Sequence, residues 1–177
     1  MRLAGDRVPD RAAMLRVDHA GEYGAARIYA GQLAVMGNRA PAAAEIERMA
    51  KGEERHLRAF DRLLIERRVR PTLLMPLWHV AGYALGVASA FAGPKVAMAV
   101  TAAVETEIDA HYQAQRAALA AGDDPVLEAT IADFQADEVE HRETAVAHGA
   151  EEAPAWPLMS ALVRAGCRAA IRTAERV

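Results

Sequence analysis

The spacing of apolar and polar positions predicts an all-α protein built from five long helices. Each predicted helix has a recognisable start or stop, because Asp and Pro favour first turns and Gly favours ends. Asp10 caps the first helix, Pro41 and Pro94 open the second and third, and Asp123 or Asp124 caps the fourth. The predicted helices cover residues 10–38, 41–68, 94–121, 125–149 and 158–177.

Residues 72–94, between the second and third helices, contain no Asp, Glu, Lys or Arg. These 23 residues are long enough to span a bilayer, but Pro76, His79 and three internal glycines make a poor spanning helix. Trp78 and Tyr83 belong to residue types that favour membrane interfaces. We therefore expect an apolar crossover that associates with one leaflet of a membrane. A crossover buried in the protein or in an oligomer interface is the alternative.

Two groups of arginines are relevant to contact with a membrane. Arg67, Arg68 and Arg70 precede the crossover, and we expect them at lipid headgroups. The last predicted helix is amphipathic and carries an arginine at every fourth position from 164 to 176. Such a helix can lie on anionic lipid or pack on the bundle as an ordinary surface helix, and both interpretations stay open.

Composition limits the classes of function. A chain of 177 residues fits one domain, 1–177, and its net charge of −3 gives no general attraction to nucleic acid. The single cysteine, Cys167, cannot form an intrachain disulfide, which fits a reducing compartment. The N-terminal residues lack the apolar region of a secretion signal.

Candidate chemistry comes from a repeated Glu-x-x-His motif. Glu138 and His141 are three residues apart, as are Glu53 and His56, so each pair shares one face of its helix. A carboxylate and an imidazole so placed can bind one metal ion, although a lone motif of this kind is a weak signal.

The motif gains weight because the two halves of the chain repeat each other. Glu22 precedes Glu53 by 31 residues, and Glu105 precedes Glu138 by 33. One Glu from each of two helices, with Glu-x-x-His from each of two others, is the ligand set of di-iron and di-manganese four-helix bundles. The predicted metal ligands are Glu22, Glu53, His56, Glu105, Glu138 and His141.

Further residues around these ligands carry expectations. Tyr29 and Tyr112 each follow a lone Glu by seven residues, and we expect Tyr112 beside the metal centre, serving substrate or electron transfer. Asp137 is a candidate for orienting a histidine of the other half, whereas its counterpart in the repeat is Gly52. The glycines at 21, 24 and 31 are costly inside a helix, and we expect a neighbouring helix or a substrate to approach them closely.

The segments LRVDHAGEYGAARIYAGQLAV, RVRPTLLMPLWHVAGYALG, AVTAAVETEI and DEVEHRETA resemble the demethoxyubiquinone hydroxylases of ubiquinone biosynthesis. The resemblance implies a ferritin-like four-helix bundle with an apolar crossover, a C-terminal amphipathic helix and two iron ions. It assigns the metal to the same six residues. It also implies oxygen-dependent ring hydroxylation of a polyprenyl quinol, demethoxyubiquinol, by a peripheral membrane protein. In a bacterium this protein would lie on the cytoplasmic face of the cell membrane.

Other classes of di-iron protein fit the same ligand set. A soluble ferritin-like ferroxidase or a rubrerythrin-like peroxidase would use the same ligands, and the apolar crossover argues against both. A tRNA-hydroxylating enzyme would need an extended basic face, which the sequence lacks. The chain has no Gly-x-Gly-x-x-Gly motif, so electrons would come from a partner, from the quinol or from NADH bound without that motif. A homo-oligomer or a partner protein of ubiquinone biosynthesis is also expected.

Overall fold

The computed structural model describes residues 10–37, 41–120, 122 and 124–176, and this part of the chain is helical without any strand. The prediction of an all-α protein is therefore confirmed. The elements are α1 (Arg11–Met36), α2 (Pro41–Arg67), α3 (Met75–Ala92), α4 (Pro94–Leu119), α5 (Pro125–Ala147), the 3₁₀ turn η1 (Ala150–Glu152) and α6 (Trp156–Ala174).

Side-chain caps begin two of the helices as predicted. The Oδ1 atom of Asp10 accepts hydrogen bonds from two amides of the first turn of α1, both at 3.0 Å. Asp124 caps α5 by accepting from the Leu127 amide at 3.2 Å. These bonds satisfy backbone donors that have no partner inside the helix.

The predicted boundaries were wrong at several helix ends. The second helix stops at Arg67 because Arg68 adopts a left-handed conformation with φ of 54°. The third stops at Leu119 and the fourth at Ala147, while α6 begins at Trp156, before the predicted Leu158. The turn η1 was not predicted. The positions Asn38, Ala121, Asp123 and Val177 lie outside the described residues.

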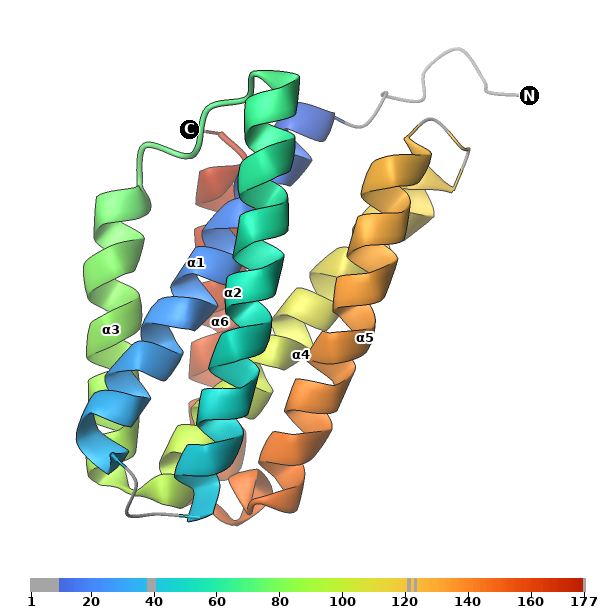
Figure 1. The fold of residues 1–177 in the computed structure, drawn as a ribbon. Coiled ribbons are helices and arrows are strands. Elements are labelled where there is room, and N and C mark those ends of the chain that lie inside the picture. Colours follow the sequence, from blue (N-terminus) through green and yellow to red (C-terminus); the bar gives the residue numbers. More distant parts are fainter. Residues whose placement is uncertain (1–9, 38–40, 121, 123, 177) are drawn as a thin grey trace.

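Four helices form the bundle that positions the site. Helix α1 packs on α2, α4 packs on α5, and α2 faces α5 across the interior (Figure 1). Helix α3 lies along α1 on the outside of this bundle, and α6 lies along α4. This is the ferritin-like arrangement that we expected, with the crossover and the C-terminal helix added on one side.

The crossover is a helix, and glycines on both sides allow its close contact with α1. A Cβ atom on Gly31 would lie 2.3 Å from the Tyr83 carbonyl oxygen, and one on Gly86 would lie 2.0 Å from the Ile28 carbonyl oxygen. The expectation for Gly31 is thus confirmed. Along the described residues, no helix combines the length and the apolar character needed to cross a membrane.

Candidate metal centre

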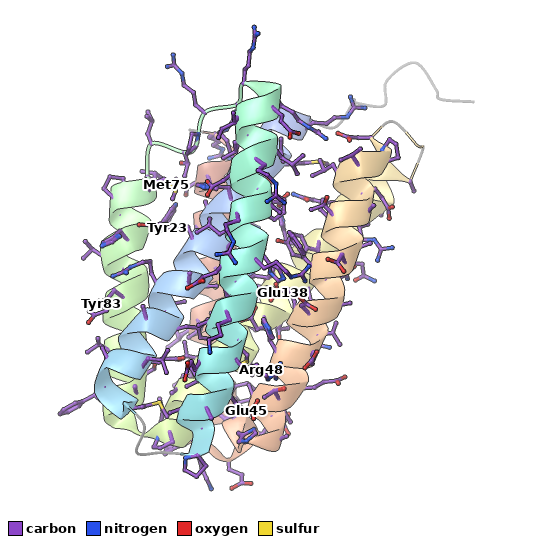
Figure 2. The ribbon with its side chains drawn as sticks, viewed as in Figure 1. Tyr23, Glu45, Arg48, Met75, Tyr83 and Glu138 are labelled. Carbon is purple, nitrogen blue, oxygen red and sulfur yellow. The ribbon has the colours of Figure 1, made fainter. Side chains whose placement is uncertain are left out.

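Four helices bring the six predicted ligands together in the interior. None of these residues is more than 3% exposed. Ligand atoms of Glu22, Glu53, His56 and Glu138 all lie within 4.8 Å of one another. A second group with the same property consists of Glu53, Glu105, Glu138 and His141. The two groups share Glu53 and Glu138, of which Glu138 lies near the middle of α5 (Figure 2). The repeat in the sequence therefore becomes two adjoining sites.

Both histidines turn the same ring nitrogen toward the carboxylates. The Nδ1 atom of His56 lies 3.2 Å from Glu22 and 3.1 Å from Glu138. The Nδ1 atom of His141 lies 3.3 Å from Glu53 and 3.5 Å from Glu138. Glu138 therefore lies between the two imidazoles, which is the position of a bridging carboxylate.

Burial and crowding of like charges perturb the acids strongly. Burial, followed by the charge of Glu138, raises the pKa of Glu53 and of Glu105 well above the ordinary 4.5. Burial also opposes the charge on Glu138, but the neighbouring imidazoles of His141 and His56 lower its pKa to about 2. Burial alone would lower the pKa of His56, yet Glu138 and Glu22 raise it to about 10. The pocket therefore favours bound cations, because they stabilise all four carboxylates in the ionised form.

Several ligand atoms of the cluster have no hydrogen-bond partner within the described structure. These atoms are buried, and an orphaned buried carboxylate is costly. They are both oxygens of Glu53, both oxygens of Glu138, Oε2 of Glu105 and Nδ1 of His141. Carboxylates with imidazoles suit iron or manganese, so this donor set fits a pair of such ions.

Two tyrosines hold the outer carboxylates, and they do so across the repeat. The hydroxyl of Tyr112 donates to Glu22, and that of Tyr29 donates to Glu105. Each tyrosine therefore binds the lone Glu of the other half. Burial, followed by these negative neighbours, raises both tyrosine pKa values, so both phenols stay protonated. Tyr112 lies beside the cluster as expected, but Tyr29 lies there equally.

Asp137 contacts a histidine of the other half, as the repeat indicated. Its Oδ2 atom lies 2.9 Å from Nε2 of His56. Arg55, which the sequence did not indicate, donates to Asp137 and also to Asp133 at 2.7 Å. Although burial opposes it, hydrogen bonds from His56 and Arg55 lower the pKa of Asp137.

Other polar residues of α4 lie outside both groups. Asp109 pairs with Arg142 at 2.6 Å. His111 contacts Gln115 at 2.8 Å and lies 3.3 Å from the buried Asp18, a contact that no motif predicted. The choice of Glu105 over Asp109 as the residue of the cluster agrees with this geometry.

The expectation for Arg67 needs correction. Arg67 forms a two-pronged ion pair with Asp124, so it joins α2 to the start of α5 and does not extend toward lipid. Arg164 and Arg168 bind the buried Glu107 at 2.6 and 2.7 Å and thereby fix α6 to α4. Helix periodicity alone could not show these partners, because they lie on other helices.

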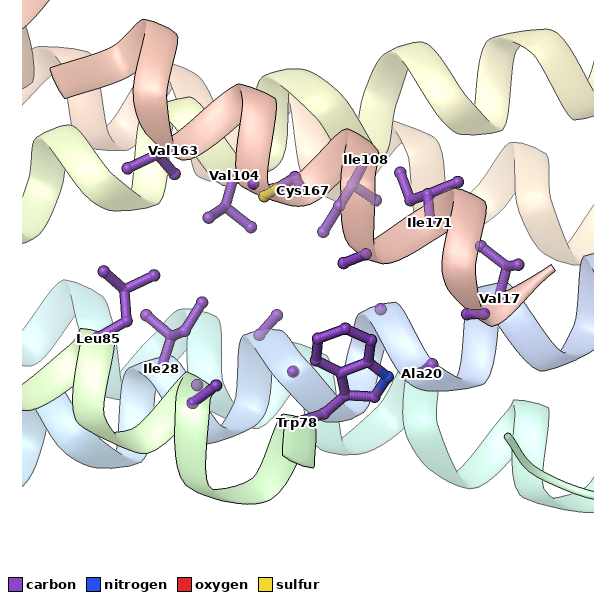
Figure 3. A pocket seen from close by; sticks show the side chains of 18 of the residues that line it. Val17, Ala20, Ile28, Trp78, Leu85, Val104, Ile108, Val163, Cys167 and Ile171 are labelled. Carbon is purple, nitrogen blue, oxygen red and sulfur yellow. The ribbon is translucent and has the colours of Figure 1, made fainter. Parts of the chain in front are cut away.

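An apolar cavity of about 470 Å³ adjoins the cluster between α1 and α3 on one side and α4 and α6 on the other (Figure 3). Gly21 and Gly24 line it, and a Cβ on either would meet nothing within 4 Å. These two glycines therefore border open space, which fits the expected approach of a substrate. Cys167 also lines the cavity, and burial raises its pKa to about 11, so it is an unreactive thiol.

Comparison with known proteins identifies the family of the chain. Residues 10–174 match the family model described as ubiquinone biosynthesis protein COQ7. The chain is 51% identical to the 3-demethoxyubiquinol 3-hydroxylase of Rhodospirillum rubrum, over 99% of this chain and 84% of the relative.

Two mammalian relatives carry a related name, NADPH-dependent 3-demethoxyubiquinone 3-hydroxylase, mitochondrial. The protein of Rattus norvegicus is 49% identical over 94% of this chain and 79% of its own length. The protein of Homo sapiens is 45% identical over 99% of this chain and 79% of its own length. With the family model matching nearly every described residue, the chain belongs to the ubiquinone biosynthesis protein COQ7 family.

Proposed function

We propose that the protein is a di-iron 3-demethoxyubiquinol 3-hydroxylase of ubiquinone biosynthesis. The observation that carries the proposal is the pair of adjoining, fully buried ligand groups with orphaned carboxylate oxygens. The names of the relatives support the reaction. A ferroxidase would use similar ligands, but it has no need for a large apolar cavity beside them.

Iron held by the six residues would supply the oxygen activation that no side chain can perform. The overall reaction places one atom of dioxygen in a ring C–H bond and reduces the other to water. This consumes two electrons and two protons. We propose that a reduced nicotinamide such as NADH supplies both electrons and one proton, and that solvent supplies the second proton. The rat relative is named NADPH-dependent, which supports a nicotinamide donor.

The protein's own groups would hold this centre in place. Tyr112 and Tyr29 keep the outer carboxylates oriented through hydrogen bonds, and Asp137 fixes the ring of His56. Both phenols are buried and protonated, so each can donate a hydrogen bond toward the cluster. We propose that Tyr112 serves the quinol or its electrons.

The cavity is the proposed quinol site. The cavity lies at the level of the cluster along α1 and α4, since Gly21 and Val104 line it while their chain neighbours Glu22 and Glu105 belong to the ligand groups. An apolar volume of about 470 Å³ excludes water and suits a quinone ring with the first part of its tail. The apolar lining supports a polyprenyl quinol as the substrate class.

We also propose that the protein is peripheral, on the cytoplasmic face of a bacterial cell membrane. An apolar stripe runs along the outer face of the crossover, and its large members are Leu73, Leu77, Val80 and Phe91, each 54–85% exposed. Burial of side chains of this size contributes roughly 1.5–3 kcal/mol each. A second copy of the chain, or a partner protein of ubiquinone biosynthesis, would compete with lipid for the same stripe.

The test is hydroxylation of demethoxyubiquinol under ¹⁸O₂ with NADH, combined with iron analysis. We expect two irons per chain and one ¹⁸O atom in the product ring. Glu138→Ala should abolish the reaction and reduce bound iron, because it removes the carboxylate between the two histidines.

The matched control is His148→Ala. His148 is exposed at the C-terminal cap of α5. Among the described residues its ring contacts only the Thr144 carbonyl, so both irons and the activity should persist. Two irons with turnover of ferrous ion or peroxide, and no labelled quinol, would favour the ferroxidase or peroxidase alternative.

A further inference from the structure

The two histidines of the cluster are related by the internal repeat, and their Nδ1 atoms have equivalent surroundings. Each Nδ1 lies 3.1–3.5 Å from two carboxylates of the cluster. The Nε2 atoms point the other way, each toward the long helix of the opposite half. The two histidines therefore differ in the surroundings of their Nε2 atoms.

On the His56 side the ring is fixed at its edge and on its face. Nε2 lies 2.9 Å from Asp137, and Asp137 is itself held by Arg55. Phe134 stacks on the ring with centroids 4.0 Å apart and an interplanar angle of 22°. A carboxylate on the outer nitrogen fixes the tautomer of a metal-binding imidazole and makes it a stronger donor.

On the His141 side the corresponding residue is Gly52, which has no side chain to offer. A Cβ there would lie 3.3 Å from both Nε2 and Cε1 of His141, so the ring lies directly against α2. None of the described residues forms a hydrogen bond with this Nε2. Within the described part of the chain, no phenyl group stacks on this ring as Phe134 does on His56. Tyr29 meets the ring edge-on, with centroids 6.5 Å apart.

We propose that this difference makes the two metal positions inequivalent, with Asp137 as the positioning residue. The position bound by Glu22 and His56 is the tight one and fills first. The position bound by Glu105 and His141 is the weaker one, and its metal exchanges more readily. The inference rests on the proposed two-metal centre and adds the order in which its positions fill.

The expected difference in metal affinity between the two positions follows from the carboxylate at Nε2 of His56. Loss of such a partner typically weakens metal binding about 10–100-fold. The wild-type protein should therefore bind its two ions in steps that differ by at least about tenfold. Asp137→Asn keeps the shape of the side chain and removes its charge, so it should weaken the tight step about 10–100-fold and leave the weak step unchanged.

The experiment is a titration of metal-free protein with Co²⁺, followed by calorimetry and by visible absorption. His56→Ala and His141→Ala assign the steps, since each should remove a different one. Helix content and thermal unfolding of the metal-free variants show that they fold. Arg55→Gln is the second variant, because it changes a half-exposed side chain and should weaken the same tight step to a smaller extent.

Gly52 provides the complementary variants. Gly52→Asp should strengthen the weak step by giving His141 a carboxylate, whereas Gly52→Ala adds the Cβ alone and should not strengthen it. Two equal steps in the wild type, or equal weakening of both steps by Asp137→Asn, would overturn the inference while leaving the two-metal centre intact. Binding of fewer than two Co²⁺ ions by the wild type would instead overturn the proposed centre.

Discussion

Replacement of Gly86 by alanine should destabilise the protein, although alanine is the better helix former. A Cβ at this position would lie 2.0 Å from the Ile28 carbonyl oxygen and 3.0 Å from the Gln32 amide nitrogen. These are backbone atoms of α1, so no rotamer change can relieve the clash. The axes of α1 and α3 must therefore move apart locally.

The change in the free energy of unfolding combines an overpacking cost with a gain in helix propensity. Overpacking of this kind costs about 1–3 kcal/mol, while alanine regains about 0.5–1 kcal/mol of helix propensity. The two ranges combine to a net loss of up to about 2.5 kcal/mol, with a midpoint of about 1 kcal/mol. In a chain of this length each kcal/mol lowers the melting temperature by about 2–4 °C. Because Gly82 and Leu85 of the same helix line the cavity, quinone binding should weaken as well.

The matched control is Gly21→Ala in α1. A Cβ at Gly21 meets nothing within 4 Å, so the substitution should stabilise the protein by about 0.5–1 kcal/mol. Thermal unfolding of the metal-free proteins, followed by helix circular dichroism, measures both. The same substitution thus has opposite signs at two positions. Equal or greater stability of Gly86→Ala would contradict the close packing of α3 on α1.

Three further predictions concern single side chains. Tyr112→Phe should retain iron and fold but slow quinol-dependent reduction of the iron, measured by anaerobic stopped flow; an unchanged rate would deny the hydroxyl a catalytic role. Leu73→Ser with Phe91→Ser should keep iron binding and lower both liposome binding and activity on long-tailed quinols more than on short-tailed ones. An equal loss of activity on both substrates would indicate that the stripe packs against protein and not against lipid. Asp124→Ala should cost about 1–2 kcal/mol at pH 7, because it removes a helix cap and the partner of Arg67. Burial opposes ionisation of Asp124, but Arg67 lowers its pKa below the ordinary 3.8, so this stability is present above about pH 4 and is lost as the pH falls through the lowered pKa. Denaturant unfolding at pH 7 and pH 3 should show the difference from wild type shrinking, and a constant difference would argue against the ion pair.

The sequence predicted the convergence of the six residues well, because a repeat constrains geometry more than a single motif does. Glu22 alone would be read as a surface acid, but its offset from Glu53 matches that of Glu105 from Glu138 almost completely. Two halves with the same spacing pack in the same way, so equivalent residues meet at the axis that relates them. The structure brings all six residues to that place.

Contacts between helices were harder to predict, because helical periodicity gives the face of a residue and not its partner. Seven residues separate Tyr112 from Glu105, so a shared face was a sound inference, yet the hydroxyl donates to Glu22 of the other half. Arg67 was placed at lipid for the same reason, whereas the start of α5 provides Asp124 as its partner. Only the order of helices around the bundle decides these pairs.

The six buried residues of the cluster do not serve the stability of the fold. Four carboxylates buried together oppose one another, and burial with like charge raises the pKa of Glu53 and Glu105 well above its ordinary value. Apolar residues of similar volume at these positions would avoid both penalties. The surrounding structure nevertheless orients the site in detail, with a tyrosine on each outer carboxylate and Asp137 on one histidine. Protonated acids in an apolar core would not need these hydrogen bonds to hold their orientation. Ligands of a bound pair of cations do need them, because the bonds fix the direction of each ligand atom.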